Sequence, residues 1–145
     1  MKRSHLVLIS ITCIVLLASC LKTNSETCHY HILVHNETSK SVYVDFAIGS
    51  DNKLDENRYG VLLRGHDWFK VSPGDTNFKG LSRRSCIESS FKYSKVSTAT
   101  IYLYDSDVLE HTDIATLVKD QYYARKFDVT LQELQDMGWE LKIKK

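Results

Sequence analysis

Hydrophobic and polar residues alternate along several short stretches of this chain, which is the pattern of half-buried β-strands. The alternation is clearest over residues 42–48, whose even-numbered positions are all apolar: Val42, Val44, Phe46 and Ile48. Residues 100–104 are also strand-like, because β-branched and aromatic residues fill them. Weaker strand patterns cover residues 28–34, 59–63, 68–71, 86–93 and 139–143. The polar residues 35–40 predict a hairpin between the first two strands.

Near the C-terminus the spacing of apolar residues becomes helical. Apolar residues at i, i+3 and i+4 predict a short amphipathic helix over residues 113–122. Thr130 and Glu133 have the spacing of a capping box, so a second helix is expected to begin there and to end near Gly138. Together these elements predict a mainly β (α+β) fold: an antiparallel β-sandwich-like domain with two short helices near the C-terminus.

The N-terminus has the layout of an export signal. Lys2 and Arg3 precede an uncharged apolar run of 12 residues, 6–17. As a helix this run would span about 18 Å, which is short for a hydrocarbon core of roughly 30 Å. Leu17-Ala18-Ser19-Cys20 matches a lipobox, where a bacterial lipoprotein is cleaved and acylated on its new N-terminal cysteine. We interpret residues 1–19 as a lipoprotein signal peptide, with soluble secretion and an uncleaved anchor as alternatives.

Cleavage before Cys20 would leave a lipidated tether, residues 20–27, and a single β-rich domain, residues 28–145. The seven residues 21–27 reach at most about 25 Å, so the domain is expected to sit close to the lipid headgroups. Leu21 follows the cysteine, where an Asp would favour retention in the inner membrane of Gram-negative bacteria. We therefore expect a palmitate-type lipid anchor on Cys20 in the outer membrane, with the domain facing the periplasm.

Composition narrows the classes of partner. Without residues 1–19, 17 basic and 18 acidic side chains remain. This near-neutral balance offers no electrostatic case for a nucleic acid partner. All eight Tyr, both Trp and all five Phe lie after residue 19, which is typical of packed β structure. The sequence Asn36-Glu37-Thr38 matches a glycosylation pattern, which we interpret as a coincidence in a turn.

The cysteines suggest one covalent link. With Cys13 discarded and Cys20 acylated, Cys28 and Cys86 are the remaining pair. Disulfides form and persist in exported proteins. A bridge that closes a loop of this length would contribute about 4 kcal/mol in the chain-entropy model. The alternative is two buried free thiols, which behave as small hydrophobic side chains.

The C-terminal residues resemble those of a family. Residues 126–134, followed by Met137-Gly138-Trp139, are similar to the tail of small uncharacterised lipoproteins of Bacteroides and its relatives. Shorter similarities involve residues 68, 71–74, 86–88 and 101–107. The chain departs from the family pattern at Phe127 and Gly138, where Tyr and Asn are usual, and at its final two lysines. The family has no assigned activity, so the resemblance implies an envelope location and no chemistry.

Three groups of polar residues are candidates for a site, and each has a plainer structural interpretation. His29, His31 and His35 would share one face of an extended strand, either as zinc ligands or as a solvent-facing strip. An acidic group could hold Ca²⁺ or simply cap a helix: Asp105, Asp107 and Glu110. Hydrolase-type residues occur without a nucleophile motif: Asp45, His66, Asp67, Ser72 and Ser85. We assign no catalytic, cofactor-binding or metal-ligating residue, and we expect no enzyme.

The leading hypothesis is an envelope lipoprotein with a structural or protein-binding role. The alternative is a glycan- or ligand-binding accessory lipoprotein, and a second alternative is a hydrolase. Tyr102 and Tyr104 bear on this choice, because they face away from Ile101 and Leu103 on their strand. If that face is open, they could stack on a glycan or on a partner protein; if it is covered, they belong to the core.

Overall fold

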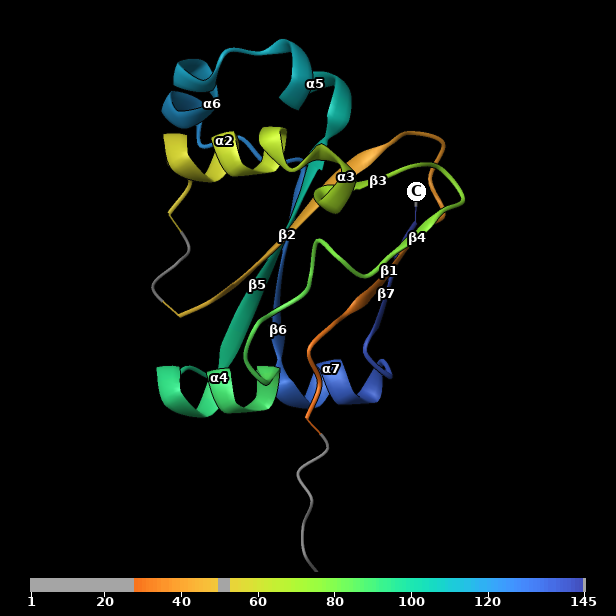
Figure 1. Cartoon of the computed structure of the whole chain (residues 1–145), viewed down its shortest axis with the longest axis vertical. Coiled ribbons are helices and arrows are strands. Elements are labelled where there is room, and N and C mark those ends of the chain that lie inside the picture. Colours follow the sequence, from red (N-terminus) through yellow and green to blue (C-terminus); the bar gives the residue numbers. More distant parts are fainter. Residues whose placement is uncertain (1–27, 50–52, 145) are drawn as a thin grey trace, which may run out of the picture.

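The computed structural model describes residues 28–49 and 53–144 (Figure 1). Its strands are β1 (Leu33–Asn36), β2 (Val42–Ile48), β3 (Lys70–Val71), β4 (Thr76–Asn77), β5 (Thr98–Asp105), β6 (Arg125–Thr130) and β7 (Glu140–Ile143). Its helices are α2 (Glu56–Arg64), α3 (His66–Phe69), α4 (Ile87–Ser94), α5 (Ser106–His111), α6 (Ile114–Asp120) and α7 (Leu131–Asp136). The predicted mixed fold is therefore confirmed, with a larger share of helix than the sequence suggested.

The strands form two sheets. The larger sheet has the order β3-β2-β5-β6 and is antiparallel throughout. The smaller sheet has the order β4-β1-β7, in which β1 is antiparallel to β4 but parallel to β7. The predicted hairpin between residues 28–34 and 42–48 is wrong, because β1 and β2 lie in different sheets. The turn after β1 redirects the chain from one sheet to the other.

The first hydrophobic core lies between the two sheets. The even-numbered residues of β2 enter it, as their alternation predicted, and β1 and β7 contribute from the smaller sheet: Val44, Phe46, Ile48, Val34, Leu141 and Ile143. Helices α4 and α7 lie together at one end of the molecule (Figure 1). Phe91 of α4 and Leu134 of α7 belong to this core, which both helices therefore help to close.

A second core lies on the opposite face of the larger sheet, beneath α2, α5 and α6. Tyr102 and Tyr104 are 3% and 0% exposed, so they are core residues and not an open binding face. Tyr59 of α2 packs edge-on against Tyr104, with 6.1 Å between the ring centres. Burial raises the pKa of Tyr59 to about 12 and also raises that of Tyr104. Both rings are therefore neutral parts of the packing at physiological pH.

Three segments expected as strands are helical wholly or in part. Residues 59–63 lie inside α2, residues 87–93 lie inside α4, and residues 68–71 are divided between α3 and β3. The Asp55 side chain accepts a hydrogen bond from the Arg58 amide and caps α2, which then buries Tyr59 and Leu62 three positions apart. These local helical signals outweigh the β propensity of the tyrosine and valine in the segment.

The two helices predicted near the C-terminus are present as α6 and α7. Thr130 and Glu133 form the capping box in both directions, with the Thr130 hydroxyl accepting from the Glu133 amide at 3.1 Å. The helix ends at Asp136, and Gly138 follows with a positive φ of 64°. Four further helices, α2 to α5, occur in the described part of the chain and were not predicted.

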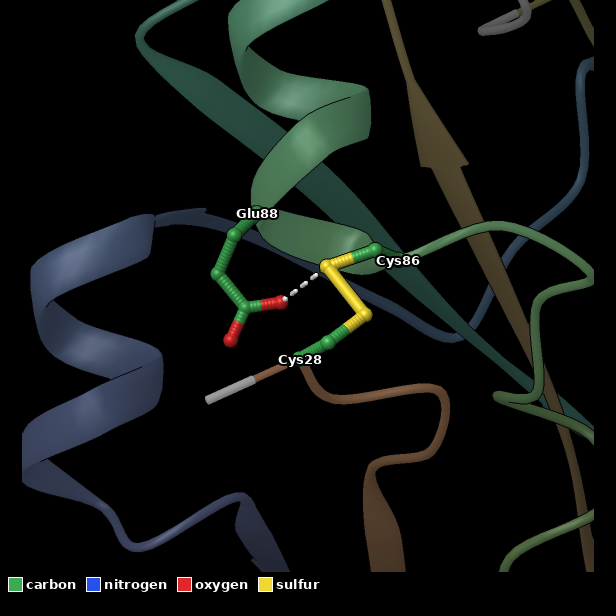
Figure 2. Close-up of side chains that lie close together, drawn as sticks. All are labelled: Cys28, Cys86 and Glu88. Carbon is green, nitrogen blue, oxygen red and sulfur yellow. Dashed lines mark hydrogen bonds between the residues drawn. A yellow bond between two sulfur atoms is a disulfide. The ribbon is translucent and has the colours of Figure 1, made fainter. Parts of the chain in front are cut away.

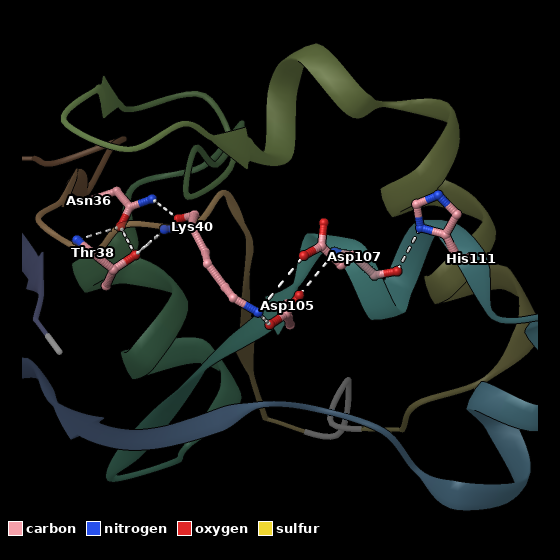
Figure 3. Close-up of polar contacts among 6 residues, drawn as sticks. All are labelled: Asn36, Thr38, Lys40, Asp105, Asp107 and His111. Atoms are coloured by element: carbon pink, nitrogen blue, oxygen red, sulfur yellow. Dashed lines mark hydrogen bonds and ion pairs between the residues drawn. The ribbon is translucent and has the colours of Figure 1, made fainter.

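Asn36, at the end of β1, connects the two sheets although it is only 1% exposed. Its side-chain amide donates to the carbonyls of Lys40 and Val71 at 2.8 and 2.9 Å. Its side-chain oxygen accepts from the amide and the hydroxyl of Thr38 at 3.0 and 2.7 Å (Figure 3). The buried amide is thus fully satisfied. Its nitrogen, which N-glycosylation would modify, already donates two hydrogen bonds within the protein.

Candidate functional site

The first candidate surrounds Cys28, the first residue that the structure describes. Cys28 and Cys86 are joined by a disulfide, with 5.3 Å between their Cα atoms (Figure 2). Cys86 directly precedes α4, and Glu88 lies in the first turn of that helix. The Ile87 amide donates to the carbonyl of His29 at 2.8 Å. Residues 28 and 29 are therefore fixed to the start of α4 by a covalent bond and by a backbone hydrogen bond.

His29 and Glu88 form a close pair beside this disulfide. Nδ1 of His29 lies 2.6 Å from Oε1 of Glu88, and the His29 amide donates to Oε2 at 3.0 Å. Partial burial acts to raise the pKa of Glu88, but the bonds from the His29 side chain and backbone outweigh it, so the pKa is lowered. The Trp139 ring stacks on the His29 imidazole, with 4.0 Å between the ring centres. The carboxylate is therefore held in one orientation.

The three histidines do not converge. His31 shares a hydrogen bond with the Ser82 hydroxyl at 2.9 Å, and His35 shares one with the Thr76 hydroxyl at 2.9 Å. Among the described residues, the single group of three potential metal ligands that lie close together is instead Cys28, Cys86 and Glu88, whose two sulfurs are joined in the disulfide.

The three acidic side chains between residues 105 and 110 have structural roles. Asp105 caps α5 by accepting from the Asp107 amide at 2.9 Å. Lys40 extends across to both carboxylates, with its Nζ 3.4 Å from Asp105 and 3.8 Å from Asp107 (Figure 3). Glu110 points elsewhere and accepts from the Tyr43 hydroxyl at 2.8 Å. The arrangement is a helix cap with a lysine partner, as the plainer interpretation predicted.

The hydrolase-type residues do not form one cluster. Asp45 forms an ion pair with Arg58, and His66 is near Asp67 and Glu110. The Ser85 hydroxyl shares a hydrogen bond with that of Ser90 at 3.1 Å. His66 and Asp67 lie together, but their contacts in the described structure bring neither Ser72 nor Ser85 to them, so no nucleophile and base are assembled.

A cleft of about 460 Å³ lies between β2 and α2. Asp45 and Arg58 form an ion pair along it, and Arg83 donates to the carbonyl of Phe46 at 3.0 Å. The Phe46 amide in turn donates to the Asp45 carboxylate at 2.7 Å. Side chains therefore satisfy the amide and the carbonyl of Phe46, which lies beyond the short pairing of β2 with β3.

A second hollow, which we call the aromatic groove, lies on the outer face of the smaller sheet. It measures about 430 Å³ and is lined by His31, Leu33, Phe78, Gly138, Trp139 and Glu140. Phe78 is 48% exposed, and its ring meets the His31 imidazole edge-on with 5.5 Å between the centres. Phe78 is thus the exposed large apolar side chain of the groove, whereas Leu33 and Trp139 are half-buried in it.

Sequence reasoning missed both the His29–Glu88 pair and the aromatic groove. The first had a usable signal: if Cys28 and Cys86 are bonded, their neighbours His29 and Glu88 must also lie close. The groove had none, because it depends on β4 and β7 lying on either side of β1, and the sequence does not specify that order.

The proposed lipidation site Cys20 and the proposed signal peptide, residues 1–19, lie outside the described residues. Within residues 28–49 and 53–144, no helix has the length and apolar character needed to cross a membrane. Comparisons with models of known protein families, with curated proteins and with solved structures gave no match to this chain.

Proposed function

We propose that this chain is a lipid-anchored protein of a bacterial cell envelope, whose domain binds a partner protein through the aromatic groove. The observation that carries the binding role is the groove itself. Phe78 stands exposed at its side, Leu33 lines it, and the polar groups of His31 and Glu140 lie around them. An apolar centre with a polar rim is the usual anatomy of a protein–protein interface.

The anchor part of the proposal rests on the lipobox Leu17-Ala18-Ser19-Cys20. Only seven residues separate Cys20 from Cys28, which the disulfide fixes to the start of α4. The described chain enters the domain at the end where α4 and α7 lie (Figure 1). A tether of at most about 25 Å would therefore turn that end towards the membrane. We expect the partner to be another envelope protein, on the periplasmic side of the outer membrane.

The resemblance to small Bacteroides-type lipoproteins supports the same location. Its most distinctive segment, residues 126–134, covers β6 and the start of α7. Phe127 and Leu131 pack against the first core, and Thr130 caps α7. The resembling residues thus have structural roles, which agrees with a shared fold in a family without an assigned activity.

A glycan is the second candidate partner. The rings of Phe78 and Trp139 line the groove together with polar groups on His31 and Glu140. Aromatic faces combined with hydrogen-bonding side chains also suit a sugar. A glycan-binding accessory lipoprotein would keep the same anchor and would differ only in what the groove holds.

Site-specific crosslinking in the native host tests this proposal. A photo-reactive phenylalanine analogue is placed at Phe78 and, as a matched control, at Tyr123, which is 44% exposed and lies outside the groove. We expect a discrete protein adduct from position 78 alone. The same adducts from both positions, or none from position 78, would count against a protein partner.

A binding assay on envelope polysaccharide separates the two candidates. If the full-length protein is retained on the polysaccharide and Phe78→Ala abolishes retention while Tyr123→Ala does not, the glycan is the better assignment. If neither variant changes retention, the groove does not bind the glycan.

A further inference from the structure

Three side chains that can bind a metal ion lie together at the disulfide: Cys28, Cys86 and Glu88. Sγ of Cys28, Sγ of Cys86 and a carboxylate oxygen of Glu88 all lie within 4.8 Å of one another (Figure 2). Oε2 of Glu88 is 3.1 Å from Sγ of Cys86. Tetrahedral zinc holds sulfur at about 2.3 Å and oxygen at about 2.0–2.2 Å, so three ligand atoms this close need only small side-chain movements to share one ion.

We propose that reduction of the Cys28–Cys86 disulfide converts this cluster into a Zn²⁺ site, with both thiolates and the Glu88 carboxylate as ligands. A dithiol reductant transfers two electrons and two protons to the sulfur–sulfur bond and becomes a disulfide itself. The two protein thiols then lose their protons as they bind Zn²⁺. A water molecule takes the fourth position, because the protein supplies three ligands.

The chemistry of the ligand set favours zinc over hard cations. Two thiolates are soft ligands, and Ca²⁺ and Mg²⁺ prefer sites made only of oxygen. Cys86 directly precedes α4, where the dipole of a helix N-terminus stabilises a thiolate. The cluster is also accessible, since Cys28 is exposed and Cys86 and Glu88 are half-buried.

The surrounding residues orient the carboxylate ligand. His29 binds Glu88 through its ring at 2.6 Å and through its amide at 3.0 Å. Trp139 stacks on the ring and limits its rotation. Residues behind the ligands commonly tune metal sites in this way, and losing one typically weakens metal binding about 10–100-fold. His29 is a positioning residue in this site.

Metal titration of the full chain in detergent, under nitrogen, tests the inference. The probes are Co²⁺ alone, which reports thiolate ligands by an intense charge-transfer absorption, and Zn²⁺ alone, which should displace it. The dithiol is removed before the titration. We expect stoichiometric binding to the reduced protein and none to the oxidised protein. A reduced protein with free Cys28 and Cys86 that retains no metal would overturn the site, whether or not it stays folded.

Two variants separate this site from other thiols of the chain. Glu88→Gln should weaken Co²⁺ binding to the reduced protein by roughly tenfold or more, whereas Glu56→Gln, at the same kind of helix start in α2, should not. Unchanged binding by Glu88→Gln would overturn the three-ligand site. Cobalt absorption that persists in the double variant Cys28→Ser with Cys86→Ser would assign the metal to Cys13 or Cys20 and would likewise overturn it. The comparison of Glu88→Gln with Glu56→Gln does not depend on whether Cys20 carries a lipid.

Discussion

The side-chain amide nitrogen of Asn36 lies 2.9 Å from the carbonyl oxygen of Val71, and this hydrogen bond connects β1 in one sheet to β3 in the other. The same amide also bonds Lys40 and Thr38 within the turn that leads to β2. A single buried side chain therefore fixes both the turn and the junction of the sheets. This explains why the turn separates β1 from β2 and does not pair them.

Replacing Asn36 should destabilise the fold. Asn36→Ala leaves the carbonyls of Lys40 and Val71 without these donors, and a lost buried hydrogen-bond partner costs about 1–3 kcal/mol. We expect the free energy of unfolding in urea to fall by roughly 2 kcal/mol or more, because several bonds are lost together. Asn57→Ala, on the exposed face of α2, is the control and should change little. Equal stability of the two variants would contradict the role of Asn36.

Glu110 should make the free energy of unfolding depend on pH in the acidic range. Its pKa is lowered by hydrogen bonds from Lys70 at 2.7 Å and from Tyr43 at 2.8 Å, which favour the charged carboxylate. The pKa of Glu110 in the folded protein therefore lies below its usual 4.5. The stabilisation that these bonds give to the folded state is complete above pH 4.5 and is lost as the pH falls below it.

The variant Glu110→Gln removes this titration while it keeps an oxygen that can accept hydrogen bonds. Below pH 4.5 its free energy of unfolding should therefore fall less steeply with decreasing pH than that of the unmodified protein. Urea unfolding at a series of acidic pH values measures both slopes. Parallel curves would show that Glu110 has the same pKa in the folded and unfolded chains.

The disulfide should be detectable in the purified protein and important for its stability. Intact mass after alkylation without reductant should show Cys28 and Cys86 unmodified, and alkylation after reduction should modify both. Opening the bridge should lower the free energy of unfolding by about 4 kcal/mol, because the unfolded chain regains the entropy of a long loop. Two alkylated cysteines in the unreduced protein would end this account of the bridge.

The sequence predicted those parts of the fold whose signals are local and unopposed. The alternation over residues 42–48 placed β2 and its buried face, and the Thr130–Glu133 spacing placed the start of α7. The sequence misled where strand-forming residues occupy a helix, as Tyr59 and Val61 do in α2. There the cap at Asp55 and the burial of Leu62 against the second core decide the structure.

The candidate sites depend on contacts far apart in the chain, which explains why the sequence predicted them poorly. His29 and Glu88 meet across a separation of 59 residues, and Trp139 stacks on His29 from the C-terminal region. The parallel pairing of β1 with β7 brings Trp139 to His29, and the Cys28–Cys86 disulfide brings Glu88 there. Only the pairing of Cys28 with Cys86 was proposed from the sequence, and it indicated one part of this cluster.

The most direct test of the anchored-protein proposal is mass spectrometry of the N-terminal peptide from protein extracted with detergent from the native host. The mature chain should begin at Cys20 and carry a diacylglycerol thioether on that sulfur, and Cys20→Ser should abolish both the cleavage and the lipid. A Cys20→Ser protein that is cleaved at the same bond and recovered in the same detergent fraction would contradict the account.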